Sequence, residues 1–177
     1  HGDAAAATVE MGIATFKPDA LPCSLNVSEL IQQPIEAAGR SLIFTGVSVG
    51  NPHCVVVKPA GESWSREELL ALGPALEHHK LFPKRTNVQL VVPTGRNAIF
   101  ILIWERGAGE TQASGSSSCA AASAAVRLGL VKSPVTVKMP GGVLNIDVAP
   151  DFSLTMKGPV AEVARGTLSP SFIRGLK

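Results

Sequence analysis

Hydrophobic residues along the chain fall mostly into short runs that are rich in valine and isoleucine and bounded by glycine, proline or asparagine. Such runs are typical of β-strands, because branched side chains pack well on a pleated sheet. The run at 98–104 is apolar without interruption, which suits a strand buried on both faces. The pattern predicts strands at 8–11, 41–49, 54–58, 86–92, 98–104, 135–139, 143–148, 152–157 and 160–165.

Two stretches have helical character instead. Ser65 and Glu68 form an S-x-x-E capping box, and leucines follow at helical spacing, so residues 66 to about 79 are predicted to form an amphipathic helix. The serines at 116–118 precede an alanine-rich segment and are predicted to be the N-cap and first turn of a second helix, which ends near Gly129.

The pattern also suggests how these elements pack. Residues 120–125 are alanine or serine, so the second helix is small on nearly every side and other backbone can close around it. A short turn of helix, interrupted at Pro34, is expected within 25–38, and the last four strands are expected to form an antiparallel meander. Eight to ten strands and two principal helices indicate an α+β fold, in which a curved, mostly antiparallel sheet wraps around a central helix.

Composition and charge narrow the class of protein. With 45% hydrophobic residues in a chain of 177 residues, a substantial core can form. A net charge of +2 with scattered Lys and Arg argues against a nucleic-acid partner, and no apolar run is long enough to span a membrane. Three cysteines without CxxC spacing indicate a reducing, cytoplasmic location and no metal site. The first residue is not methionine, so a piece of a longer protein is expected.

The loop between the strand at 98–104 and the alanine-rich helix is the most chemically specific part of the chain. It carries Glu105, Arg106 and three glycines, and it leads into a helix start whose free N–H groups favour a carboxylate or phosphate. A serine nucleophile at 114–118 lacks the G-x-S-x-G motif and an acid partner for His53, and a phosphate loop lacks its lysine.

A third interpretation is a site for a small amino acid, held by its carboxylate at the helix start. Asn51, Asn87, Glu105 and Arg106 would be its polar contacts, since all four lie at strand ends or in loops. His53 shares a tight loop with Asn51, where Pro52 enforces a bend.

Several separated motifs support this third interpretation. The blocks VEMG, VGNPHCVV, FPKRTNVQ, WERGAGETQASGSSSCAAASAA, PGGVLNI and MKGPVAEVARG occur in this order. They resemble the C-terminal half of diaminopimelate epimerases, which are amino-acid racemases and epimerases that work without pyridoxal phosphate. The resemblance implies a family domain over 8–166, and the ends at 1–7 and 167–177 are expected to be loose. In the family, two pseudo-symmetric halves, each a sheet wrapped about a helix, close on the substrate.

The resemblance also implies an activity and its residues. The activity is the cofactor-free interconversion of LL- and meso-diaminopimelate, an isomerase step of lysine biosynthesis in which two bases transfer the α-proton. Glu105 would contact the reacting amino group, and His53 would support the bases. The family implies two substrate-binding sets: Asn51, Asn87 and Arg106 at the distal end, and the N–H groups of Gly115 and Ser116 at the α-carboxylate.

One departure from the family pattern concerns the chemistry directly. Where the family has ACGTGxCA, this chain has ASGSSSCA, so Ser114 stands at the position of the second catalytic cysteine, while Cys119 matches a cysteine expected to be buried packing. A thiol has a pKa of about 8.5, lowered further at a helix start, whereas a serine hydroxyl is a much weaker acid. The family's other catalytic cysteine belongs to the N-terminal half.

These departures leave alternatives open. The chain is expected not to epimerise diaminopimelate alone, and to pair with the missing N-terminal half or with a second copy in a homodimer. A non-catalytic family member that keeps the fold for binding or pairing, or an epimerase of another amino acid, would share the same motifs.

Overall fold

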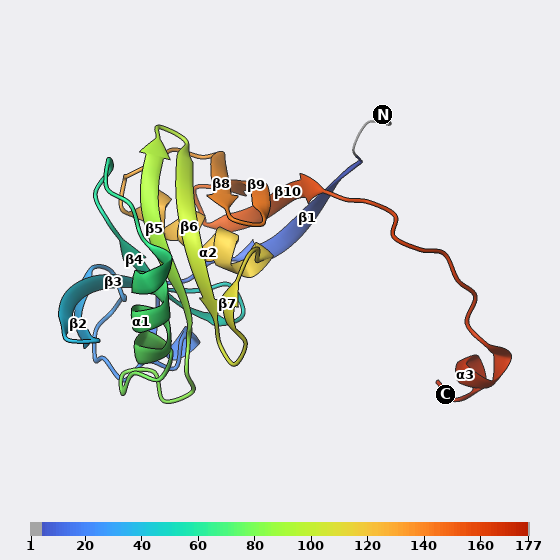
Figure 1. Cartoon of the computed structure of the whole chain (residues 1–177), viewed down its shortest axis with the longest axis horizontal. Coiled ribbons are helices and arrows are strands. Elements are labelled where there is room, and N and C mark those ends of the chain that lie inside the picture. Colours follow the sequence, from blue (N-terminus) through green and yellow to red (C-terminus); the bar gives the residue numbers. More distant parts are fainter. Residues whose placement is uncertain (1–4, 177) are drawn as a thin grey trace.

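The computed structural model describes residues 5–176 and contains one large curved sheet with a helix on each face (Figure 1). The strands are β1 Ala6–Ile13, β2 Gln33–Ala37, β3 Arg40–Ser48, β4 Pro52–Val57, β5 Asn87–Gly95, β6 Ala98–Glu105, β7 Gly109–Thr111, β8 Val135–Met139, β9 Gly142–Val148 and β10 Ser153–Pro159. The ten-stranded sheet has the order β1-β10-β9-β8-β6-β5-β4-β3-β2, and β7 pairs with β6. Only the pairs β4–β5 and β6–β8 are parallel, so the predicted α+β, mostly antiparallel fold is confirmed.

Strict alternation along the central strands creates two separate cores. On β5, Val88, Leu90 and Val92 face the leucine-rich helix α1 (Arg66–Glu77), whereas Val91 faces the alanine-rich helix α2 (Gly115–Arg127). Strand β6 alternates in the same way, which confirms that it is packed on both faces. Successive side chains of a strand point to opposite faces, and both faces are covered here by a helix.

Helix α1 covers one face and makes the parallel crossover from β4 to β5. The predicted capping box is present, because the Ser65 hydroxyl accepts from the N–H of Glu68 and the Glu68 carboxylate accepts from the N–H of Ser65. The helix ends at Glu77, two residues before the predicted end. Gly73 permits its close approach to the sheet, since a Cβ there would lie 2.6 Å from the Trp104 ring.

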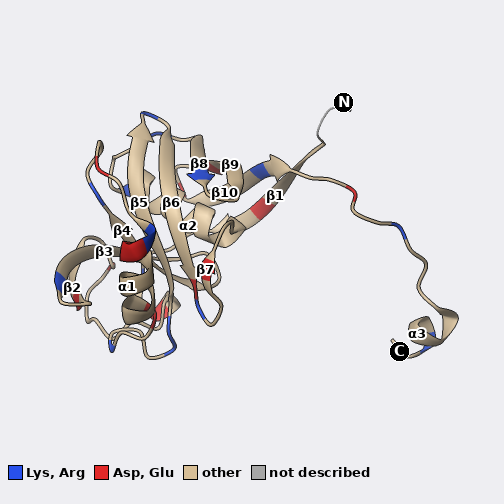
Figure 2. Ribbon diagram, in the orientation of Figure 1, with Lys and Arg blue, Asp and Glu red and all other residues tan. Residues whose placement is uncertain are grey.

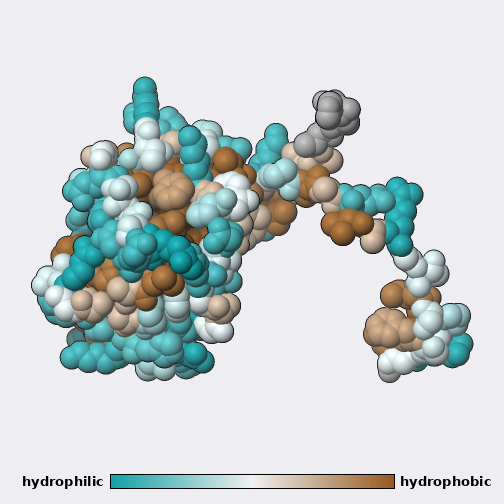
Figure 3. Space-filling model, viewed as in Figure 1, coloured by the Kyte–Doolittle hydropathy of each residue, from teal (hydrophilic) through white to brown (hydrophobic). Residues whose placement is uncertain are grey.

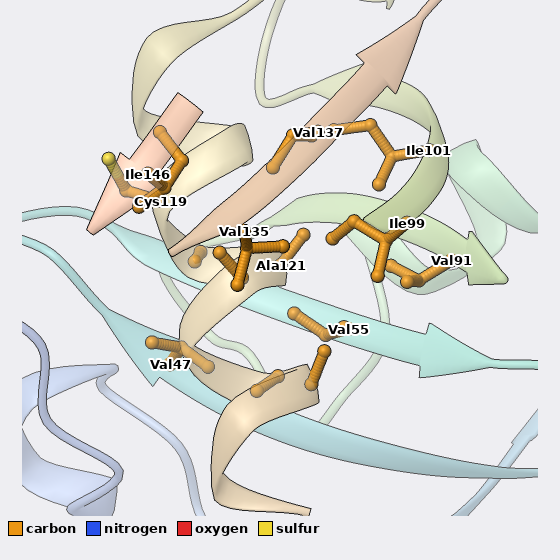
Figure 4. Packing of buried hydrophobic residues seen from close by; sticks show 14 of the residues in the cluster. Val47, Val55, Val91, Ile99, Ile101, Cys119, Ala121, Val135, Val137 and Ile146 are labelled. Carbon is orange, nitrogen blue, oxygen red and sulfur yellow. The ribbon is translucent and has the colours of Figure 1, made fainter. Parts of the chain in front are cut away.

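Helix α2 lies inside the curved sheet, as predicted. It contacts strands β3 to β6 and β8 to β10, and residues 117–125 are all buried. Figure 4 shows Ala121 within a shell of valine and isoleucine side chains from several strands. Gly129 follows the helix with φ +70°, and the bonds from Gly129 N to Val126 O and from Leu130 N to Ala125 O complete a Schellman motif.

The helix start is one correction to the sequence prediction. Ser114, not a residue of 116–118, is the N-cap, and Gly115 is already helical. Ser114 is extended (φ −155°, ψ 127°), as N-cap residues are. The three serines that follow lie within the first turn.

Two predicted elements are wrong. Residues 25–38 contain no turn of α-helix; instead, β2 forms at the edge of the sheet. Pro34 is tolerated there, because an edge strand has one side without a pairing strand and does not need the N–H that proline lacks. Residues 160–165 form no strand and are exposed, because β1 occupies the place beside β10. The short strand β7 and a 3₁₀ turn at Pro18–Ala20 have no counterpart in the prediction.

The N-terminal end of the described chain joins the sheet, whereas the C-terminal end does not pack against it. Residues 1–4 and 177, part of the ends expected to be loose, lie outside the described residues, and β1 begins at Ala6. After β10 the chain runs away from the sheet and finishes in the short helix α3 (Pro170–Arg174), which buries no residue (Figure 1). Apolar side chains of this tail are exposed (Figure 3): Val163, Leu168, Phe172, Ile173 and Leu176.

Charged residues and cysteines are scattered through the fold. Lys and Arg are spread over loops, strand edges and the tail (Figure 2). All three cysteines are free thiols, with Cys54 and Cys119 fully buried. Within residues 5–176 no helix is long and apolar enough to cross a membrane, and no cluster of three His, Cys, Asp or Glu side chains could hold a metal ion.

Candidate active site

Four segments converge where the parallel strands β4 and β5 begin. His53 and Asn87 are register partners on these strands, and the β6 residue Trp104 pairs with Val88 next to Asn87. The loop after β6 carries Glu105 and Arg106, and the start of α2 lies on the same face of the sheet as His53. The predicted site residues thus come from separate parts of the sequence to one end of the sheet.

Asn87 joins two of these segments through its side chain. Its Nδ2 donates to the backbone oxygen of Pro52 at 2.8 Å, and its Oδ1 accepts from the backbone N–H of Arg106 at 2.9 Å. The amide is buried, with 7% of the residue exposed. Asn87 therefore fixes the position of the loop that carries Asn51 relative to the loop that carries Arg106, and one N–H of its amide remains for another partner.

His53 is fully buried and held by Asn51. Its Nε2 lies 2.9 Å from Oδ1 of Asn51. Burial lowers the pKa of the ring to about 3, and the positive charge of Arg106 adds to this, while the Gln89 side chain acts in the opposite direction. The ring is therefore neutral at physiological pH, so it serves as a hydrogen-bonding group and not as a cation.

The loop from Glu105 to Gly109 is anchored by α1. Glu77, only 3% exposed, accepts hydrogen bonds from Trp104 Nε1 at 2.7 Å and from the N–H of Gly107 at 2.8 Å. Burial alone would raise the pKa of this carboxyl, but the hydrogen bonds from Trp104 and Gly107 outweigh it and lower the pKa. Gly107, at φ +79°, makes the turn possible. Glu77 thus holds the backbone on which Glu105 and Arg106 stand.

The start of α2 lies beside a shallow hollow of about 240 Å³. Gly115 and Ser116, as the first two residues of the helix, have no intrahelical acceptor for their N–H groups. The Ser114 hydroxyl accepts from the N–H of Ser117 at 3.4 Å, and Ser118 Oγ donates to the Ser114 carbonyl at 2.8 Å. The hollow is lined by Ala113, Ser114, Gly115, Met139, Gly141, Gly142, Val143, Leu144 and Pro159.

Two glycines let the chain close around this hollow. A Cβ on Gly115 would lie 3.0 Å from the Met156 sulfur, and one on Gly141 would lie 2.8 Å from the backbone oxygen of Gln112. Larger residues at these positions would push β10 or the loop before β9 away from the helix start.

A buried polar link connects the two halves of the site. Gln89 lies on the α2 face of β5, and its Nε2 donates to the Ser117 hydroxyl at 3.0 Å. Ser117 belongs to the first turn of α2, and Gln89 also interacts with the ring of His53. Gln89 therefore lies between the Asn51–His53 pair and the first turn of α2, and it is hydrogen-bonded to the latter.

The sequence prediction missed two residues of this arrangement. Gln89 and Glu77 make the connecting hydrogen bonds, yet neither belongs to the predicted site. Gln89 had a detectable signal, because it is a polar residue in an apolar run and shares a strand face with Asn87. Glu77 had none, since it occupies the end of an amphipathic helix where acidic residues are common on the solvent side. Glu105 itself is half-buried on the loop that Glu77 holds.

Comparisons with known proteins show to which family the chain belongs. The family model for diaminopimelate epimerase matches residues 45–163. The chain is 41% identical over 163 residues to the diaminopimelate epimerase of a Synechococcus species, covering 90% of this chain and 57% of that protein. It is 43% identical over 161 residues to diaminopimelate epimerase 2 of a Nostoc species, covering 91% of this chain and 55% of that protein. The chain therefore spans somewhat more than half the length of the curated relatives it matches.

Solved structures share the fold. A predicted epimerase from Pseudomonas aeruginosa has a TM-score of 0.58 at 21% identity, over 92% of this chain and 58% of that one. A hydroxyproline epimerase from Agrobacterium vitis also has a TM-score of 0.58, at 11% identity, over 87% and 49%. With the sheet-wrapped helix, the ordered motifs and the match over 45–163 together, the chain belongs to the diaminopimelate epimerase family.

Proposed function

We propose that this chain supplies the substrate-binding and one proton-transfer position of a diaminopimelate epimerase-like isomerase acting in lysine biosynthesis. The observation that carries the proposal is the hydrogen bonding of His53 with Asn51, and of Asn87 with the loop of Pro52 and with the backbone N–H of Arg106. These groups and the free N–H groups at the start of α2 offer hydrogen-bond donors at two separated points, which suits a substrate with a carboxylate at each end.

The proposed role of each group comes from the resemblance to the family, and its position supports that role. The N–H groups of Gly115 and Ser116 would bind the α-carboxylate, because they are unpaired and stand at the positive end of the helix dipole. Asn51, Asn87 and Arg106 would hold the distal end. Glu105, on the loop fixed by Glu77, would contact the reacting amino group.

The proton transfer itself needs two groups on opposite sides of the α-carbon. Ser114 occupies one such position in the proposal, and no other residue lining its hollow has an ionisable side chain. The opposing acid–base group would come from a further domain or from a second copy of the chain. A serine hydroxyl is a poor acid, so we expect α-proton exchange from diaminopimelate in deuterated water to stay at the background rate with this chain alone.

Ligand binding tests the proposal independently of activity. Titration of ¹⁵N-labelled protein with diaminopimelate should shift the amides of Gly115 and Ser116 and the side-chain amide of Asn51. Lysine is the matched ligand, since it lacks only the distal carboxylate, and should bind more weakly. Arg106→Gln should abolish this preference, and the exposed Arg96→Gln should preserve it. Equal binding of the two ligands, or shifts confined to other residues, would contradict the proposal.

A second candidate is a non-catalytic member that binds anions. Ser114 favours it, because its hydroxyl acts as the helix N-cap and none of the described residues that line its hollow is a base. In that case sulfate should shift the Gly115 to Ser117 amides as strongly as diaminopimelate does, with no effect of the distal carboxylate.

Assembly follows from the same proposal. The exposed apolar residues of the tail and the open site would be covered by another domain or a second copy, since large apolar patches seldom stay unpaired. Sedimentation equilibrium should show a species larger than the 18.4 kDa monomer. A single monomeric species up to about 100 μM, where an interaction of about 5.5 kcal/mol becomes visible, would refute pairing between copies.

A further inference from the structure

Gln89 lies buried between the two halves of the candidate site, with His53 on one side and Ser117 on the other. Its Nε2 donates to Ser117 Oγ at 3.0 Å, while its Oε1 has no hydrogen-bond partner. The Nδ1 atom of His53, the residue with which this side chain interacts, is also without a partner. These are the buried side-chain atoms within residues 5–176 that lack a partner. They belong to diagonal neighbours on the same face of the sheet, because His53 on β4 pairs with Asn87 on β5 and Gln89 follows two residues later.

The hydrogen bond between His53 and Asn51 determines which ring nitrogen of His53 carries the proton. His53 Nε2 lies 2.9 Å from Asn51 Oδ1, and a carboxamide oxygen can only accept. Nε2 must therefore carry the proton of the neutral ring, which leaves Nδ1 as an acceptor. Gln89 Oε1 is an acceptor as well, so the two unpaired atoms cannot bond to each other in this orientation. Buried polar atoms without partners are rare because they cost free energy.

We propose that Gln89 is the positioning residue of His53, and that its amide is turned by a half-rotation so that Nε2 donates to His53 Nδ1 and Oε1 accepts from the Ser117 hydroxyl. The two ends of an amide occupy nearly the same space, so this exchange requires no repacking. It pairs both unpaired atoms and gives the Ser117 proton an acceptor. Every hydrogen bond then runs one way, from Ser117 to Gln89, His53 and Asn51.

The direction of this chain has a consequence for the ligand, which rests on the proposed function. With its oxygen occupied by His53, Asn51 presents only the two N–H groups of Nδ2 to the site. It therefore favours a hydrogen-bond acceptor such as a carboxylate over an amine at the distal position. The comparison of diaminopimelate with lysine described above tests this consequence separately.

The competing arrangement keeps Gln89 as placed and moves the proton to His53 Nδ1. Asn51 would then have to turn its Nδ2 toward the ring, losing a donor from the site. The Ser117 hydroxyl, whose only hydrogen bond within the described chain is with Gln89, would accept from Nε2 and keep its own proton unpaired. This arrangement satisfies fewer buried groups.

The two arrangements differ in a ring tautomer that NMR measures directly. Long-range ¹H–¹⁵N spectra of the full chain at neutral pH should show His53 with a protonated Nε2 and a bare Nδ1, and a coupling across the hydrogen bond from Gln89 Nε2 to Nδ1. A protonated Nδ1 in the unsubstituted chain would overturn the proposal, whether or not any variant folds.

A substitution at Gln89 provides a second test. A carboxylate can only accept, so Gln89→Glu should bring a proton to Nδ1, a change that loss of packing would not produce. Gln32→Glu makes the same chemical change at an exposed position and should leave the His53 signals unaltered. A bare Nδ1 in a folded Gln89→Glu variant would also overturn the proposal. Because no ligand is present, neither result depends on whether diaminopimelate binds.

Discussion

The two faces of the sheet are packed by different means. On the α1 face, leucine, phenylalanine and tryptophan side chains fill the space between helix and sheet. On the α2 face the helix contributes little more than alanine methyl groups, and valine and isoleucine from the strands supply the volume. On the second face the sheet curls around the helix, which contacts strands β3 to β6 and β8 to β10, because small side chains let the strands approach it from several sides.

The buried polar residues are divided just as unevenly. His53, Gln89, Ser117 and neighbouring serines lie on the α2 face, whereas Glu77 is the polar group that α1 buries. Small residues allow side chains from the strands to reach the helix start and bond to it. The α1 face acts as a cover whose one buried carboxylate holds the Glu105–Arg106 loop in place. The α1 face thus holds the bulky helix side chains, and the α2 face holds most of the buried polar side chains.

The largest effect should come from adding volume on the α2 face. Ala121→Leu introduces a branched side chain at a fully buried position where the strands surround the helix, and it should lower the free energy of unfolding by about 3 kcal/mol. Ala71→Leu, an exposed position on α1, should change it by less than about 0.5 kcal/mol. Urea unfolding of both variants checks the contrast, and a small loss in Ala121→Leu would show that the helix is loosely enclosed.

The second-largest loss of stability should come from replacing Glu77, the α1 residue that anchors the Glu105–Arg106 loop. Glu77→Gln replaces one acceptor oxygen by a donor that faces Trp104 Nε1 or Gly107 N–H, so it should cost about 2 kcal/mol. Because folding lowers the pKa of Glu77, its contribution is present above the unfolded pKa of about 4.3 and is lost as the pH falls through the folded value. The difference in free energy of unfolding between Glu77→Gln and the parent should therefore become smaller below about pH 4. Glu62→Gln, in an exposed loop, is the control.

The α2 face should show its own pH dependence through His53. Burial lowers the pKa to about 3, so between about pH 6.5 and 3 the unfolded chain binds a proton that the folded chain does not. Stability should fall with falling pH by up to about 1.4 kcal/mol per unit in this range. Urea unfolding at pH 7 and pH 5 should show a smaller difference for His53→Gln than for the parent. Equal differences would mean that His53 is solvated or charged in the folded state.

Sequence patterns predicted the sheet, both helices and the wrapped α2 helix, because alternation and helical spacing report burial directly. They failed where a pairing partner decided the outcome. Residues 160–165 alternate like a strand, but β1 pairs with β10 and leaves them no neighbour. Within 25–38, propensity favoured a turn of helix, whereas pairing with β3 made an edge strand that tolerates Pro34.

The sequence predicted the candidate site as a set of residues, and their roles remain predictions. The structure adds two local contacts among them: His53 bonds with Asn51, and Asn87 accepts from the backbone N–H of Arg106. Their supports, Gln89 and Glu77, were not foreseen, since whether a polar residue in a strand or at a helix end is buried depends on which element covers it. Register and crossing of elements, which one sequence does not display, set these contacts.

The smallest effect concerns the two helix caps and bears on the role of residue 114. The Ser65 hydroxyl accepts from the N–H of Glu68 at 3.2 Å, whereas the Ser114 hydroxyl accepts from the N–H of Ser117 at the longer distance of 3.4 Å. Ser65→Ala should therefore cost about 1 kcal/mol and Ser114→Ala about 0.5 kcal/mol. Such a result would mean that packing of the alanine helix, and not its cap, holds the start of α2, so position 114 can be given to proton transfer without loss of the fold. If thermal unfolding shows the larger loss for Ser114→Ala, the serine is chiefly a structural cap, and the non-catalytic candidate gains support.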